Sequence, residues 1–112
     1  MAAWIMSYKY NLVFDGPAAL QRVIEKLRTS QAYVGEGDGA IWLKDQKQST
    51  LAVYDVRLTK LDSLSAWLEV NFRSLNLHEL FDDSLAGANL RCFEDGDFDD
   101  EVTLREAFRI KN

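Results

Sequence analysis

The chain has few of the residues that build metal, disulfide or nucleophilic sites. Its 112 residues include one cysteine, Cys92, and one histidine, His78. A lone cysteine excludes an intramolecular disulfide and favours a reducing compartment, and the two residues together are too few for a structural zinc site. Cys92 or Ser84 could pair with His78 as nucleophile and base. However, Cys92 lies in an apolar strand pattern, which is typical of a buried thiol, so we expect no enzyme.

Long apolar runs and phosphate-binding glycine motifs are also missing. No run approaches the roughly 18 apolar residues that cross a membrane. The N-terminal residues carry no basic segment, so we expect no signal peptide and a cytoplasmic protein. The three glycines of the run Gly35–Gly39 are separated by acids that would repel phosphate. This run predicts a hairpin turn, and we expect no cofactor.

The sequence does have the ingredients of one globular domain spanning 1–112. Apolar residues make up 47% and charged residues 28% of the chain, as in ordinary folded proteins. A chain of this length buries enough apolar surface to fold without a metal or a disulfide.

Hydrophobic periodicity predicts an α+β fold. Apolar residues alternate over 3–14, which predicts a strand, and helical spacing follows Pro17 over 17–30. Further strands are predicted at 32–36, 40–44, 50–58 and 88–94, and further helices at 62–75 and 77–86. Residues 102–111 fit either type, and we favour a strand paired with 88–94. The order strand–helix–strand–strand–strand–helix–(helix)–strand–strand predicts a mostly antiparallel sheet with two or three helices packed on one face.

Negative charge is concentrated in one quarter of the chain. The net charge is −5, and residues 76–101 contain 9 of the 18 acids but a single base, Arg91. The densest part is Glu94–Glu101, where six of eight residues are acidic. Such a balance disfavours binding to nucleic acid, whose phosphates would be repelled, and we expect no membrane partner. It favours a basic partner.

Two interpretations of this acidic segment remain open. It is either a solvated loop that keeps the sheet edge from aggregating, or a docking surface on which Phe98 anchors a partner and the acids steer its approach. Trp42 is either an exposed binding anchor on a short strand or a residue packed under the second helix. The predicted partner-binding residues are Asp82, Asp83, Glu94, Asp95, Asp97, Phe98, Asp99, Asp100, Glu101 and Trp42.

The segment 95–106 also resembles the calcium loop of an EF-hand. Asp95, Asp97, Asp99 and Glu106 match positions 1, 3, 5 and 12 of that loop, which supply oxygen ligands. Val102 and Thr103 fall at positions 8 and 9. The sequence departs from the family at position 6, where Asp100 replaces the glycine of the sharp turn, and a strand pattern replaces the entering helix.

These features predict a non-enzymatic binding protein, a small acidic inhibitor or adaptor. Small size, acidity and the lack of a catalytic motif are typical of bacterial toxin-immunity proteins. A nuclease-type toxin presents a basic cleft that an acidic loop can cover. The alternatives are a calcium-binding module that uses 95–106, a small enzyme or ligand-binding domain whose site the sequence does not reveal, and a homodimer that pairs exposed strand edges.

Overall fold

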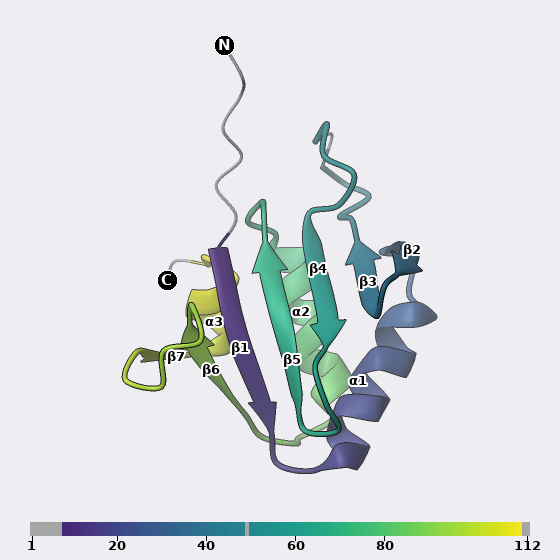
Figure 1. Ribbon diagram of the computed structural model, residues 1–112. Coiled ribbons are helices and arrows are strands. Elements are labelled where there is room, and N and C mark those ends of the chain that lie inside the picture. Colours follow the sequence, from purple (N-terminus) through teal and green to yellow (C-terminus); the bar gives the residue numbers. More distant parts are fainter. Residues whose placement is uncertain (1–7, 49, 111–112) are drawn as a thin grey trace.

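The computed structural model describes residues 8–48 and 50–110, and within them it has the predicted α+β architecture. Seven strands form one sheet in the order β2-β3-β4-β5-β1-β6-β7, with all neighbouring strands antiparallel. The strands are β1 (Tyr8–Phe14), β2 (Tyr33–Gly37), β3 (Ala40–Leu43), β4 (Val56–Lys60), β5 (Ser65–Val70), β6 (Leu90–Glu94) and β7 (Glu101–Val102). The helices are α1 (Pro17–Arg28), α2 (Leu75–Leu85) and α3 (Leu104–Ala107). Figure 1 shows α1 and α2 on the same side of the sheet, so we call the opposite side the open face.

The core lies between the sheet and the two long helices. On β1, Tyr10, Leu12 and Phe14 are buried beneath the helices, while Asn11 and Val13 face the other way. The predicted strand is therefore confirmed for 8–14, and its first residues, 3–7, lie outside the described residues. The predicted helix at 17–30 is confirmed over the range of α1. Its buried face consists of Ala19, Leu20, Val23, Ile24 and Leu27.

The prediction of a helix at 62–75 is wrong. Within this range Ser65–Val70 forms β5, which pairs with β1 on one edge and with β4 on the other. The apolar residues of this segment fit both the two-residue period of a strand and the 3.6-residue period of a helix. Ala66, Leu68 and Val70 alternate and are all buried, as in a strand, whereas Leu64 and Trp67 fit a helical stripe. The segment is a strand because it pairs with two neighbouring strands, and the local spacing of apolar residues cannot predict that pairing.

Two other boundaries differ from prediction. The strand predicted at 50–58 begins at Val56, because the preceding residues form a loop around the buried carboxylate of Asp55. The segment 102–111 is a strand only at its start, where Val102 pairs with Cys92, and α3 follows. Thr103 and Glu106 form a reciprocal capping box, a helix-start signal that our interpretation of the sequence overlooked.

The remaining elements agree with the sequence. The run Gly35–Gly39 makes the predicted hairpin between β2 and β3, with Gly39 at a φ of 79° in the region that favours glycine. Helix α2 corresponds to the helix predicted at 77–86 and starts two residues earlier, at Leu75. The Ser74 hydroxyl caps it by accepting a hydrogen bond from the Leu77 amide. Among the described residues, no helix has the length and apolar character needed to cross a bilayer.

Candidate functional site

The acidic segment Glu94–Glu101, which we call the acidic loop, is a folded hairpin between β6 and β7. The Asp95 amide donates to the Lys9 carbonyl over 2.8 Å, which ties the loop to β1. Inside the loop, the Asp100 amide donates to the Asp97 carbonyl and the Glu94 amide to the Asp100 carbonyl, each over 2.9 Å. Figure 1 shows the loop at the β7 end of the sheet. The backbone therefore holds the acids in a defined arrangement despite their mutual repulsion.

Most carboxylates of this loop face solvent. The exposed residues are Asp95, Asp97, Asp99, Asp100 and Glu101, and Glu94 is half-buried. Within the described residues, Glu101 alone of these acids has an ion-pair partner, since Arg91 donates to both of its oxygens at 2.8 and 3.1 Å. These bonds from Arg91 lower the pKa of Glu101. Asp97 caps its own turn by accepting the Asp99 amide over 2.9 Å. The loop thus presents a dense negative charge to the surroundings.

Phe98 lies in the middle of the acidic loop. Its side chain is 69% exposed, although phenylalanine usually prefers the interior. Its ring meets the buried ring of Phe93 edge to face, with 4.8 Å between the centroids. The guanidinium of Arg91 lies 5.1 Å from the Phe93 centroid. Phe98 therefore packs on a buried ring while most of its surface stays exposed to solvent.

The structure does not join Asp82 and Asp83 to the acidic loop. Both are exposed on α2, near the end of that helix. The chain then passes through β6 before it reaches the acidic loop at the far end of that strand (Figure 1). The predicted patch is therefore split into a helix part and a loop part.

Trp42 also lies away from the acidic loop. It faces the open side of the sheet, in register with Arg57, and β4, β5 and β1 separate its strand from β6. Its ring stacks on Tyr54, with centroids 6.4 Å apart, and covers Gly35, where a Cβ would come within 3.3 Å of the indole. Trp42 is half-buried. It is neither of the two alternatives the sequence suggested, because it is neither a projecting anchor nor packed under a helix.

The structure reveals two buried carboxylates that sequence reasoning missed. Asp45 accepts hydrogen bonds from the Ser74 hydroxyl at 2.7 Å, the Asn76 amide group at 3.1 Å and the Lys47 backbone amide at 2.9 Å. Burial alone raises the pKa of Asp45, but these hydrogen bonds outweigh it and lower the pKa overall. The network fastens the 44–55 loop to the start of α2.

The second buried carboxylate, Asp55, completes this network. It accepts the Asp45 backbone amide at 2.9 Å and the Thr50 hydroxyl at 2.6 Å. The Lys44 ammonium in turn donates to the Thr50 hydroxyl at 2.6 Å. No local sequence signal identified either acid, because their main partners are separated from them in the chain.

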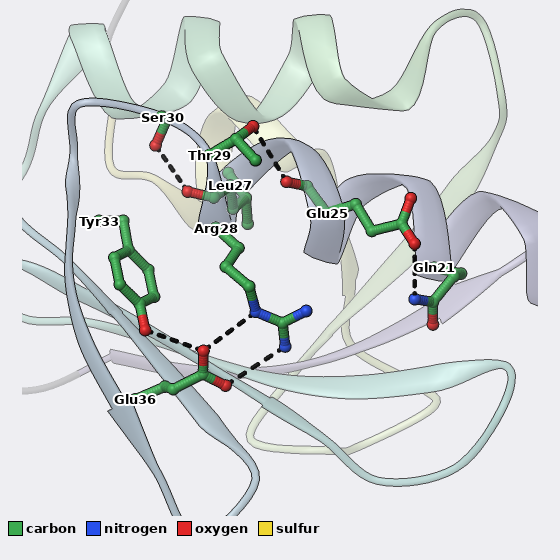
Figure 2. Close-up of polar contacts among 8 residues, drawn as sticks. All are labelled: Gln21, Glu25, Leu27, Arg28, Thr29, Ser30, Tyr33 and Glu36. Carbon is green, nitrogen blue, oxygen red and sulfur yellow. Dashed lines mark hydrogen bonds and ion pairs between the residues drawn. The ribbon is translucent and has the colours of Figure 1, made fainter.

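A further charged cluster ties α1 to the edge strand β2. Figure 2 shows the Glu36 carboxylate between the Arg28 guanidinium and the Tyr33 hydroxyl. Arg28 donates to its two oxygens at 3.0 and 3.2 Å, and Tyr33 donates at 2.8 Å. These bonds lower the pKa of Glu36 and raise that of Tyr33. The charges pair with one another, so the cluster joins two elements and offers little to a ligand.

The nucleophiles considered from the sequence are placed as core residues. Burial raises the pKa of the Cys92 thiol to about 12, so the reactive thiolate is scarce near neutral pH. The Ser84 hydroxyl donates to the Phe81 carbonyl over 2.6 Å, and His78 packs edge-on against Phe108. Neither pair has the arrangement of an activated nucleophile.

The calcium ligands suggested by the sequence are likewise not gathered. Glu106 lies on α3, and its carboxylate accepts the Thr103 amide over 2.9 Å. In the part of the chain that the structure describes, no three acidic, histidine or cysteine side chains are placed to hold a metal ion.

Comparison of the chain with family models, curated proteins and solved structures gave no match. Its function is therefore argued from its own residues.

Proposed function

We propose that this protein is a non-enzymatic binding module that docks the acidic loop on a basic surface of a partner protein. The observation that carries this proposal is Phe98, a largely exposed aromatic ring seated on Phe93 at the centre of an ordered acidic hairpin. The ring gives the loop an apolar contact surface surrounded by negative charge, which is the arrangement of a binding anchor.

The Phe98 ring and the carboxylates of the acidic loop would contribute to binding in different ways. Exposed carboxylates attract a basic surface over about a Debye length and raise the association rate. A rigid aromatic side chain supplies apolar burial at the centre of the interface and slows dissociation. Partners of this chemistry include proteins with a basic cleft for a nucleic acid, in which case the module would act as an inhibitor or adaptor.

The proposed interface is smaller than the residue set predicted from the sequence. It comprises the acidic loop, including Phe98, and leaves out Asp82 and Asp83, which lie on α2, and Trp42, whose ring is engaged with Tyr54. This narrowing makes the two aspartates of α2 a useful internal control.

The test is affinity capture from the native lysate at low salt, with elution by a salt gradient. The loop variant combines Asp97→Asn, Asp99→Asn and Asp100→Asn. The control combines Glu79→Gln, Asp82→Asn and Asp83→Asn, three exposed acids of α2, and removes the same charge. A basic protein retained by wild type and control but lost by the loop variant would support the proposal. Equal retention by all three proteins would contradict it.

Kinetics with the captured partner separate the two roles. The loop variant is expected to lower the association rate roughly tenfold at low salt and to flatten its salt dependence. Phe98→Ala is expected to weaken affinity about thirtyfold through faster dissociation, with the salt dependence unchanged. If Phe98→Ala leaves the dissociation rate unaltered, the ring does not anchor the partner.

A further inference from the structure

A cavity of about 500 Å³ lies between the start of β1, the end of β5 and the residues of and after α3. This volume lies within the range of small-molecule sites. Tyr8, Val70 and Ile110 give it apolar walls, and Arg73 and Arg109 bring two guanidinium groups to it. We call it the arginine pocket.

The charge of this pocket is opposite to that of the protein as a whole. The chain carries a net −5, yet among the described residues the pocket is lined by two arginines and a single acid, Glu106. Neither arginine forms an ion pair with a carboxylate among the described residues. The Glu106 carboxylate is already bound to the Thr103 amide in the capping box. Glu94, which is not among the lining residues, also attracts Arg109. The described lining itself therefore carries one more cation than anion.

Arg109 occupies a backbone position that usually favours glycine. It follows the C-cap of α3 with a φ of 63°, in the left-handed region. Its guanidinium lies 4.0 Å from the centroid of the Tyr8 ring, and it neighbours the buried Tyr10 hydroxyl, whose presence raises the pKa of Arg109. That hydroxyl has no hydrogen bond of ordinary geometry. The side chain is therefore held at the pocket wall before any ligand arrives.

The site extends beyond Arg73. An adjoining hollow of about 290 Å³ shares Arg73 and Ile110 with the pocket and is lined also by Gln48 and Leu75. Leu75 is 49% exposed although it begins a helix that packs on the core. For a ligand with its charged head at the arginines, Ile110 and Leu75 offer apolar side chains against which a short hydrocarbon chain can pack.

We propose that the arginine pocket binds a small organic monocarboxylate, with its carboxylate between Arg73 and Arg109 and its hydrocarbon part against Val70, Ile110 and Leu75. A guanidinium matches a carboxylate through two parallel hydrogen bonds. One negative charge, together with Glu106, balances the two arginines, whereas a doubly charged phosphate would leave excess negative charge beside an acidic protein. This ligand site is separate from the docking function proposed for the acidic loop.

The test is a titration of the full chain with hexanoate, followed by backbone amide NMR. Saturable shifts are expected at Tyr8, Val70 and Ile110. Acetate, which lacks the chain, and hexanol, which lacks the charge, are expected to bind much more weakly. Arg73→Gln and Arg109→Gly are each expected to weaken hexanoate binding about tenfold. Glycine suits the left-handed backbone at 109, so this variant should fold.

Lys26→Gln is the matched control, because it removes one exposed positive charge on α1, outside the pocket. Unchanged hexanoate binding in this variant supports the proposal. Absence of saturable shifts at millimolar hexanoate would overturn it, and so would equal binding by wild type and both arginine variants. Tighter binding of hexyl phosphate than of hexanoate would overturn the assignment to a carboxylate.

Discussion

Two groups of carboxylates in this protein have the same chemistry and opposite surroundings. Asp45 and Asp55 are buried at the base of the 44–55 loop, where the carboxylate of Asp45 accepts hydrogen bonds from three residues and that of Asp55 from two. The carboxylates of the acidic loop are mostly exposed, and Glu101 alone among them has an ion-pair partner in the described part of the chain. Solvation and hydrogen bonding, rather than acidity, therefore separate the structural acids from the acids that remain exposed.

The reason lies in the cost of taking a charge out of water. A buried carboxylate is tolerated when donors replace its hydration, and removing it then leaves those donors unsatisfied. An exposed carboxylate keeps its water, so it adds little to stability and can exchange that water for a partner's cations. The two groups should therefore respond in opposite ways to the same substitution.

The largest expected effect is the loss of a buried acid. Asp55→Ala should lower the free energy of unfolding by about 3 kcal/mol, because the Asp45 amide and the Thr50 hydroxyl lose their acceptor. Asp99→Ala in the acidic loop, the matched exposed change, should alter it by less than about 0.5 kcal/mol. Urea unfolding at neutral pH measures both. Similar losses in the two variants would contradict a difference in role between the buried and the exposed acids.

Acidification is expected to have an intermediate effect and to act through Asp45. Its pKa in the folded state is lowered, so its stabilising contribution is fully present above its unfolded pKa of about 3.9. The contribution is lost as the pH falls through the lower folded value, where the unfolded state binds the proton first. Unfolding free energies measured between neutral pH and this range should decline less steeply for Asp45→Asn than for wild type. Parallel declines would mean that the network does not favour the ionised form.

The smallest effect is expected for the variant that combines Asp97→Asn, Asp99→Asn and Asp100→Asn. Removing like charges relieves repulsion, so stability should stay the same or rise by up to about 0.5 kcal/mol, and more at low salt than at high salt. Thermal unfolding at two ionic strengths measures this change. A loss above about 1 kcal/mol would place these acids with the structural group and would complicate the binding test.

The sequence was sufficient to predict those elements that depend on residues adjacent in the chain. The alternation in β1, the proline that starts α1 and the glycine-rich turn between β2 and β3 were each predicted from adjacent residues. The concentration of acids in Glu94–Glu101 was likewise evident from the sequence. The capping box of α3 was also readable there, although we did not use it.

Tertiary structure decided what depends on distant partners. Ser65–Val70 fits two periods, and pairing with β1 and β4 made it a strand. Asp45 became a structural acid because Ser74 and Asn76 meet it from 29 and 31 residues away. Folding likewise set Phe98 on Phe93 and placed Arg73 and Arg109 at one cavity. The charges and periodicities can thus be read from the amino-acid order alone. Their roles depend on burial and strand pairing, because both require contacts between segments far apart in the chain.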